Sequence, residues 1–267
     1  MIDLHIHTTY SDGTYTLKEI LKEAQNKNLE VISLTDHDNV KVYNELKDIN
    51  IKDFYCGEII TGCEFKCVFP EYELPIEILG YGFKVSVIEQ FLNSYNGVEK
   101  QIRYLEFLKE VGKSIGLKFN ENIDIKRNEY ASAIFEKEIN KYEINKKILM
   151  ENGVYIQTNF YRDAQCNKNS IFYINESKDY VEPNIIIDLI HSAGGKAFLA
   201  HPYIYKVDDV IEMTEKFINK YNIDGLECYY STFSQNQTNN LIQLCKKCGQ
   251  YTIHLYLHLY KNLHQHH

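Results

Sequence analysis

The stretch MIDLHIHTTYSDGTYTLKEILKEAQNKNLEVISLTDHD, residues 1–38, predicts a strand, a helix and a second strand. Apolar and polar residues alternate over 2–7, with the two-residue period of a strand. Thr16 and Glu19 form a capping-box pattern that begins a helix. An apolar strand then ends in the polar residues 35–38. This order, within roughly 35 residues, is typical of a βαβ unit with two parallel strands and a right-handed crossover.

The same order of elements continues along most of the chain. Two more strands are expected at Glu58–Phe65 and Leu74–Tyr81, and alternation resumes after Pro183. Repeated strand-then-helix order predicts a parallel sheet with both faces covered. Between these parts the chain is polar, charged and helix-rich, which indicates an inserted helical subdomain. We therefore expect an α/β protein with an inserted helical subdomain at 88–165 and a main unit formed by 1–87 and 166–267.

Composition limits the classes of function. The 267 residues carry a net charge of −8, which argues against a broad nucleic-acid-binding face but allows a small phosphorylated substrate held by cations. No stretch approaches the roughly 20 apolar residues of a membrane span, and the first residues lack the pattern of a signal peptide. We expect a cytoplasmic protein with no membrane partner. The seven cysteines, including Cys245 and Cys248, are expected to be free thiols.

Polar residues gather where the expected strands end. On the first strand, His5 and His7 share one face. In α/β folds the ligand site lies beyond the carboxyl ends of the strands, so a closed or nearly closed barrel would bring such residues together. The other candidates at strand ends are Asp36, His37, Glu64, Glu77, His201 and Glu227.

The types of these residues indicate metal chemistry. A lone histidine at a strand end is usually a hydrogen-bonded packing residue. A mixed set of imidazoles and carboxylates is instead typical of a multinuclear hydrolytic site, in which two ions about 4 Å apart activate water and clamp a phosphoester. The combination that carries this prediction is His5, His7, Asp12, His37, Glu64 and His201.

Five segments resemble the successive motifs of one family. DLHIHTTYSDGT, ISLTDHDNV, ITGCEF, EILGYGF and GGKAFLAHP are similar to motifs of the PHP (polymerase and histidinol phosphatase) superfamily. The resemblance covers residues 1–85 and 183–230. It implies a distorted seven-stranded β/α (TIM-like) barrel, with two or three divalent metal ions (Mn, Zn, Fe or Mg) at the carboxyl ends of its strands, and hydrolysis of phosphoesters. The helical insertion resembles the branch of the family that acts on small molecules and nucleotides.

The resemblance also implies roles for individual residues. Glu77 stands where the family usually has histidine, and a carboxylate favours harder ions such as Mn or Mg. Glu227 resembles a glutamate behind the ligands, and Tyr230 stands where relatives often have histidine. His37 and His201 are also candidates to protonate the leaving oxygen. The implied metal ligands are His5, His7, Asp12, His37, Glu64, Glu77 and His201.

The end of the chain departs from the family pattern. Relatives continue with a Gly-Gly-Ser-Asp-Phe-His type motif that supplies an aspartate and a histidine to the metals. Residues 249–267 instead read GQYTIHLYLHLYKNLHQHH, without an aspartate. Two hypotheses stay open: an altered coding sequence replaced the natural end, or His254 or His258 substitutes as a ligand.

These features together predict a metal-dependent phosphoesterase that uses a metal-activated water. The expected substrates are phosphate esters of small molecules, first nucleotides or short oligonucleotides. Histidinol phosphate is an alternative substrate, and a degenerate barrel that binds metal or phosphate without turnover is an alternative class. The acidic charge disfavours long duplex nucleic acid. The 22 tyrosines include candidates for stacking on a nucleobase, although most are expected to pack in the core and on the surface.

Overall fold

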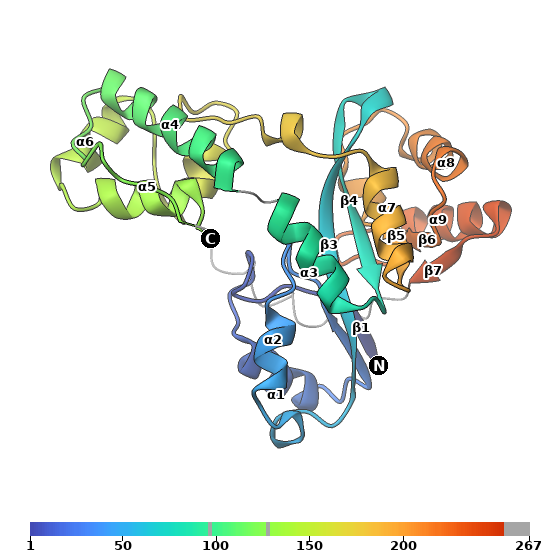
Figure 1. Cartoon of the computed structure of the whole chain (residues 1–267). Helices are drawn as coiled ribbons and strands as arrows, with labels where there is room; N and C mark the ends of the chain where they lie inside the picture. Colours follow the sequence, from blue (N-terminus) through green and yellow to red (C-terminus); the bar gives the residue numbers. More distant parts are fainter. Residues whose placement is uncertain (96–97, 127–128, 254–267) are drawn as a thin grey trace. The chain divides into compact units, whose positions relative to one another are not determined.

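The computed structural model describes residues 1–95, 98–126 and 129–253, and the chain forms two compact units (Figure 1). The first unit holds Met1–Gln90 and the chain from Asp179 onward, and the second holds Phe91–Lys178. In the first unit a single sheet has seven strands, each paired with the next along the chain. They are β1 (Ile2–Ile6), β2 (Val31–Leu34), β3 (Glu58–Phe69), β4 (Leu74–Tyr81), β5 (Lys196–Leu199), β6 (Gly225–Glu227) and β7 (Tyr251–Ile253).

The sheet is mixed, so the prediction of a wholly parallel sheet is wrong at β4. This strand runs antiparallel to both β3 and β5, whereas the other neighbouring pairs are parallel. The reason is the short Pro70–Glu73 connection, which makes a hairpin, because a parallel neighbour needs a crossover of a dozen or more residues. The α/β class and the seven strands are confirmed. The sheet curls into a half-barrel with β1 and β7 as its edges among the described residues, and closure into a TIM-like barrel stays a prediction.

Helices follow the strands of the first unit as the sequence pattern indicates. Thr16 begins α1 with the predicted capping box, since its side chain accepts from the Glu19 amide and its amide donates to the Glu19 carboxylate. The helix then buries its apolar face, including Leu17 and Leu21. The helices are α1 (Leu17–Asn26), α2 (Val42–Lys47), α7 (Pro183–Ser192), α8 (Val210–Lys220) and α9 (Gln235–Cys248), and α3 (Val85–Tyr95) begins in this unit.

The second unit is helical around an aromatic core. The rings of Phe135, Phe160 and Phe172 contact one another with centroids 5.1–6.0 Å apart. The helices around them are α4 (Val98–Ser114), α5 (Ala131–Ile139), α6 (Ile144–Glu151) and a π-helix at Tyr161–Gln165. The domain boundaries expected near 87 and 165, and the role of this segment as an inserted subdomain, stay predictions.

All seven cysteines are free thiols, as predicted. Within the described residues, no helix is both long and apolar enough to cross a membrane.

A hydrogen-bonded carboxylate fixes the amino-terminal edge of β5 and β6. The Asp224 side chain accepts from the Ala197 amide at 2.9 Å, from His191 Nε2 at 2.7 Å and from Lys196 Nζ at 2.7 Å. Burial raises the pKa of Asp224, but these hydrogen bonds outweigh it and hold the pKa below its ordinary value. The carboxylate therefore stabilises the fold only while it is ionised.

Replacing this carboxylate is expected to destabilise the first unit. Asp224→Ala leaves the Ala197 amide without its partner, so we expect the free energy of unfolding at pH 7 to fall by about 1–3 kcal/mol in urea titrations. The lowered pKa means that the contribution of Asp224 is present above about pH 4 and is lost as pH falls through the folded pKa. The wild-type advantage should therefore shrink below about pH 4. Asp208→Ala, at an exposed turn, is the control; equal losses in both variants would contradict the assignment.

Candidate metal centre

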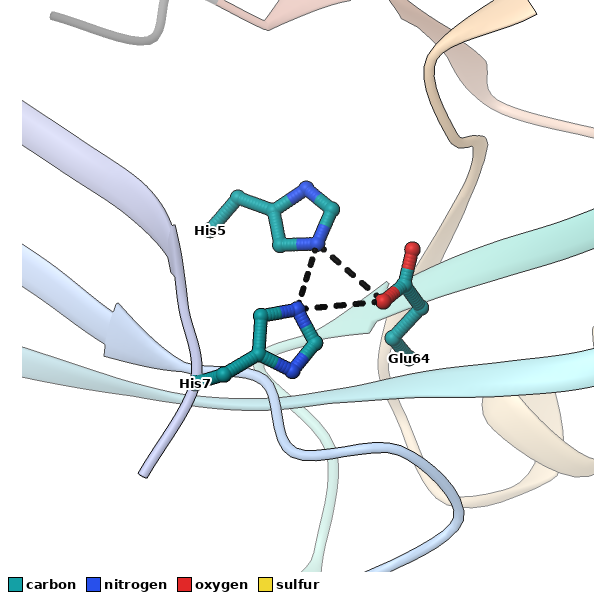
Figure 2. A group of neighbouring side chains, drawn as sticks. All are labelled: His5, His7 and Glu64. Carbon is teal, nitrogen blue, oxygen red and sulfur yellow. Dashed lines mark hydrogen bonds and ion pairs between the residues drawn. The ribbon is translucent and has the colours of Figure 1, made fainter. Parts of the chain in front are cut away.

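Strand β1 delivers two histidines to one point. His5 and His7 alternate with buried Ile6, so both imidazoles lie on the face opposite the core. Their Nε2 atoms are 3.0 Å apart, and each is 3.2 Å from Oε2 of Glu64 on β3 (Figure 2). All three side chains are at most 6% exposed, so bulk water does not screen this contact.

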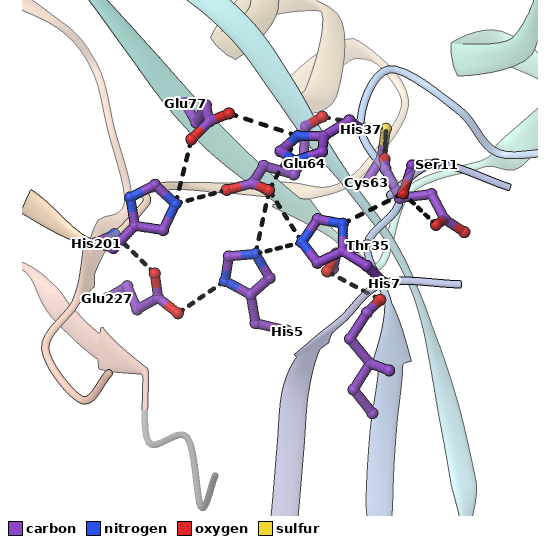
Figure 3. Close-up of polar contacts among 12 residues, drawn as sticks. His5, His7, Ser11, Thr35, His37, Cys63, Glu64, Glu77, His201 and Glu227 are labelled. Carbon is purple, nitrogen blue, oxygen red and sulfur yellow. Dashed lines mark hydrogen bonds and ion pairs between the residues drawn. The ribbon is translucent and has the colours of Figure 1, made fainter. Parts of the chain in front are cut away.

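Glu64 is the common neighbour of four histidines (Figure 3). Besides these contacts with His5 and His7, the Glu64 Oε2 lies 3.2 Å from His37 Nδ1, and its Oε1 lies 2.9 Å from His201 Nε2. His37 follows β2 and His201 follows β5, so three separate strand ends converge on one carboxylate.

Glu64 and Glu77 do not lie at strand ends, and this part of the prediction is wrong. Strand β3 continues to Phe69 because it pairs with β4 beyond the last residue of β2. Glu64 nevertheless lies level with the end of β2, through a bridge to His37. Glu77 enters from the middle of the antiparallel strand, on the same face as Glu64, since Glu64 pairs with Leu79 in the register. The hairpin, and not a strand end, thus brings Glu77 to the cluster.

Two further carboxylates complete the cluster. The Glu77 carboxylate is 3.5 Å from His37 Nδ1 and 3.2 Å from His201 Nε2. Oδ1 of Asp12 is 3.3 Å from His7 Nδ1 and 3.7 Å from His37 Nε2. All seven predicted metal-site residues are therefore neighbours in the structure. Three combinations place their ligand atoms within 4.8 Å of one another: His5, His7 and Glu64; His7, Asp12 and His37; and His37, Glu64 and Glu77.

The distances between the nitrogen and oxygen atoms of the cluster suit atoms that hold a cation between them. Two ligands that hold one ion at about 2.1 Å, roughly at right or tetrahedral angles, lie about 3.0–3.4 Å apart, and the Nε2 and carboxylate contacts fall in this range. His37 Nδ1 faces two carboxylates, yet it makes no hydrogen bond although it is buried. A buried donor atom without a hydrogen bond is costly, and an ion between it and the carboxylates would satisfy it. The set of imidazoles and carboxylates suits Mn, Zn, Fe or Mg.

The negative charge of the carboxylates in the cluster is balanced by protonated histidines. Burial lowers the pKa of His5, but Glu64 and Glu227 overcome it and raise that pKa well above its ordinary value. Burial is likewise overcome at His201, where Glu64 and Glu77 raise the pKa to about 10. Burial would raise the pKa of Glu64, but the histidines, His5 and His37 foremost, hold it well below its ordinary value. Divalent cations compete for the same atoms, so their binding releases protons.

Glu227 on β6 holds two of the predicted ligands, His5 and His201, in place. Its carboxylate is fully buried and accepts from His5 Nδ1 at 2.9 Å and from the His201 backbone amide at 2.7 Å. The first contact leaves His5 Nε2 facing the cluster, as outer carboxylates do for metal-bound imidazoles. The second holds His201 at a φ of 24°, in the left-handed region. The position expected from the sequence for Glu227, behind the ligands, agrees with these contacts.

Asp36 organises the loop after β1 and contacts no ligand atom. It accepts hydrogen bonds from the Thr8 amide at 2.8 Å, the Thr8 hydroxyl at 2.7 Å and the Ser11 hydroxyl. Ser11 Oγ also lies 3.3 Å from His7 Nδ1, a contact that sequence reasoning did not predict. Gly13 allows the tight turn, since a Cβ there would lie 2.2 Å from the His7 carbonyl oxygen. The polar run TTYSDG predicted a turn after the first strand. The sequence alone did not show that Asp36, in the next motif, accepts hydrogen bonds from this loop.

The two histidines proposed as substitute ligands, His254 and His258, lie outside the described residues. Tyr230, which stands where relatives often have histidine, lies next to the cluster, with its ring centroid 5.1 Å from that of His201 and 6.2 Å from that of His5.

Comparisons with known proteins agree with this site. The family model of the PHP domain matches residues 3–232. The 5'-3' exoribonuclease Rnm of Escherichia coli is 24% identical over 264 residues, which cover 92% of this chain and 80% of that protein. A 5'-3' exoribonuclease of Haemophilus influenzae is 25% identical over 232 residues, which cover 83% of this chain and 74% of that protein.

Two solved structures share the fold. An amidohydrolase from Chromobacterium violaceum has a TM-score of 0.65 at 19% identity, over 94% of this chain and 84% of that one. A protein from Bifidobacterium adolescentis described as a metal-dependent phosphoesterase has a TM-score of 0.62 at 20% identity, over 94% of this chain and 85% of that one. At these identities the likeness concerns the fold.

Proposed function

Because this chain belongs to the PHP domain family, we infer that it is a metal-dependent phosphoric ester hydrolase. The observation that carries this proposal is the buried Glu64 carboxylate, with histidine nitrogens from three strand ends within 3.2 Å of its oxygens. A packing role explains such a cluster poorly, because burying several ionisable groups is costly without a ligand that all of them share.

The chain offers ligands for two or three divalent ions. We propose that His5, His7 and Glu64 form one ligand group, and that Asp12, His37, Glu77 and His201 complete the others around Glu64. When bound, divalent ions lower the pKa of water and stabilise the charge of the phosphoryl group during hydrolysis. Harder ions such as Mn or Mg suit the three carboxylates of this set.

Exposure indicates the side from which a substrate approaches. Asp12, Glu77 and His37 are 38%, 23% and 21% exposed, whereas His5 and His201 are 5% and 6% exposed. The substrate phosphate would therefore meet the cluster on the side of Asp12, His37 and Glu77. Of the two candidate proton donors, His37 is the more accessible, and it would protonate the leaving oxygen from a ring nitrogen that holds no ion, with His201 as the alternative donor.

We propose nucleotides or short oligonucleotides as the substrates. Support comes from the two relatives named as exoribonucleases, which match most of the chain at 24–25% identity. The net charge of −8 also favours a small phosphorylated substrate over long duplex nucleic acid. Residues 1–87 and 166–267 would carry the chemistry, with 88–165 as an inserted helical subdomain.

A substrate screen tests this proposal. Tag-free protein loaded with Mn or Zn should release phosphate or nucleotide from at least one of three substrates: a nucleoside 5'-monophosphate, a short 5'-phosphorylated oligoribonucleotide, or histidinol phosphate. His7→Ala removes a nitrogen from two of the three ligand combinations, so we expect it to lower the rate at least about 100-fold.

The control for that screen is His191→Ala, the same change at the opposite edge of the sheet, where His191 contacts Asp224. Its rate should stay within about twofold of wild type. Absence of hydrolysis with every metal and substrate would overturn the proposal and favour a barrel that binds metal or phosphate without turnover.

A further inference from the structure

A row of aromatic rings leads away from the metal centre. Tyr230 packs against His201 with ring centroids 5.1 Å apart, Phe233 against Tyr230 at 5.4 Å, and Tyr203 against Phe233 at 5.5 Å. We call Tyr230, Phe233 and Tyr203 the aromatic row. Neighbouring ring planes are inclined by 51–80°, so the faces point in different directions. The row begins at His201, a proposed metal ligand that also lies 3.2 Å from Glu77 on the exposed side of the cluster.

The row comes from the loops that carry ligand contacts in α/β folds. Tyr203 lies in the short helical turn Pro202–Ile204 after β5, and the other two lie between β6 and α9. Loops at the carboxyl ends of strands contact substrates in such folds. All three side chains are only half-buried, whereas Phe69 and Phe217, elsewhere in this unit, are fully buried. The row therefore keeps apolar ring surface accessible beside the cluster.

The neighbouring polar groups are amides and hydroxyls. The segment from Gly225 to Asn240, which carries Tyr230 and Phe233, contains no lysine or arginine. It contains instead the amide-rich start of α9, QNQTNN. Among these amides, Asn240 donates from Nδ2 to the Tyr203 hydroxyl at 3.3 Å. Asparagine and glutamine amides hydrogen-bond the edges of bases, and aromatic rings stack on their faces.

We propose that the aromatic row is a subsite for the base of a nucleotide whose phosphate binds the metal centre. The proposal rests on the proposed function and names the recognition element of that same site. An aromatic surface with the Asn240 amide beside Tyr203 suits a nucleobase, and divalent ions bound at the metal centre would suit the attached phosphate. Phe233 is the central ring of the row, so it should contribute most of the discrimination between a nucleotide and a phosphate ester without a base.

Equilibrium dialysis tests the subsite without requiring turnover. The full chain is loaded with Mg, and the dissociation constants of adenosine 5'-monophosphate and ribose 5-phosphate are measured. Phe233→Leu keeps an apolar side chain but removes the ring. Stacking on one base is worth about 1–3 kcal/mol, so this variant should bind adenosine 5'-monophosphate about 5- to 150-fold more weakly. Its affinity for ribose 5-phosphate should stay within about twofold of wild type, and Phe233→Tyr should bind both ligands like wild type.

Tyr251→Leu is the matched control, because Tyr251 is exposed and lies at the start of β7, beside Asp224 at the opposite edge of the sheet. Two results would overturn the subsite: wild type binds both ligands equally, or Phe233→Leu weakens both equally. Hydrolysis is measured separately. Turnover without discrimination between the two ligands refutes the subsite alone, whereas base-dependent binding without turnover of any substrate in the screen above supports the subsite and refutes the proposed function.

Discussion

Glu64→Gln is expected to lower phosphoester hydrolysis at least about 1000-fold and to reduce the number of bound divalent ions per chain. The substitution keeps the shape of the side chain but removes the charge that four histidines share. His5, His7, His37 and His201 all place a nitrogen within 3.2 Å of this carboxylate, so an amide cannot satisfy them together. Metal content by elemental mass spectrometry and initial rates with a nucleoside monophosphate measure the two effects.

The control for this variant is Glu58→Gln on the same strand. Glu58 begins β3 and is exposed, so the same chemical change there tests the general effect of losing one negative charge. We expect its metal content to match wild type and its rate to stay within about twofold. The assignment of Glu64 would be wrong if Glu64→Gln bound the same number of ions and retained its rate. Circular dichroism of both variants separates a loss of ligands from a loss of fold.

The sequence predicted which residues gather at the site better than it predicted the strand direction that brings each of them there. Alternation in β1 predicted that His5 and His7 share a face, and the structure agrees. Glu77 was expected at the end of a parallel strand, but it lies within an antiparallel one. The alternating pattern of a strand is the same in both directions, so only the length of the connection to β3 distinguishes them.

The sequence alone could not predict contacts between motifs that lie far apart along the chain. The position of Glu64 among four histidines depends on the registers of β1, β2, β3 and β5, which a single sequence does not specify. The same is true of Asp36, which was expected among the polar residues at the strand ends and hydrogen-bonds Thr8 and Ser11. Residue types predicted a metal centre, whereas the fold was needed to separate the candidate ligands from the residues that hydrogen-bond around them.

Removing divalent ions is expected to abolish hydrolysis and to lower the thermal stability of the chain. Without ions, His37 Nδ1 is a buried atom that makes no hydrogen bond, and the carboxylates of the cluster are balanced only by protons on histidine. Ions that bind the folded chain alone stabilise it by about 2.7 kcal/mol at a concentration 100 times the dissociation constant. For a chain of this size the melting temperature should then rise by roughly 5–10 °C when Mn is added to protein treated with a chelator.

Differential scanning calorimetry with and without Mn measures this shift, and phosphate release on the same samples measures the return of activity. Glu64→Gln serves as the internal comparison, since its melting temperature should respond to Mn by less than half the wild-type shift. Potassium chloride at equal ionic strength controls for screening of the acidic surface. If chelated protein kept its rate and its melting temperature, the cluster of histidines and carboxylates would be a packing device, and the proposed hydrolase would need another catalytic centre. If Mn restored stability without activity, the chain would be a protein that binds metal without turnover.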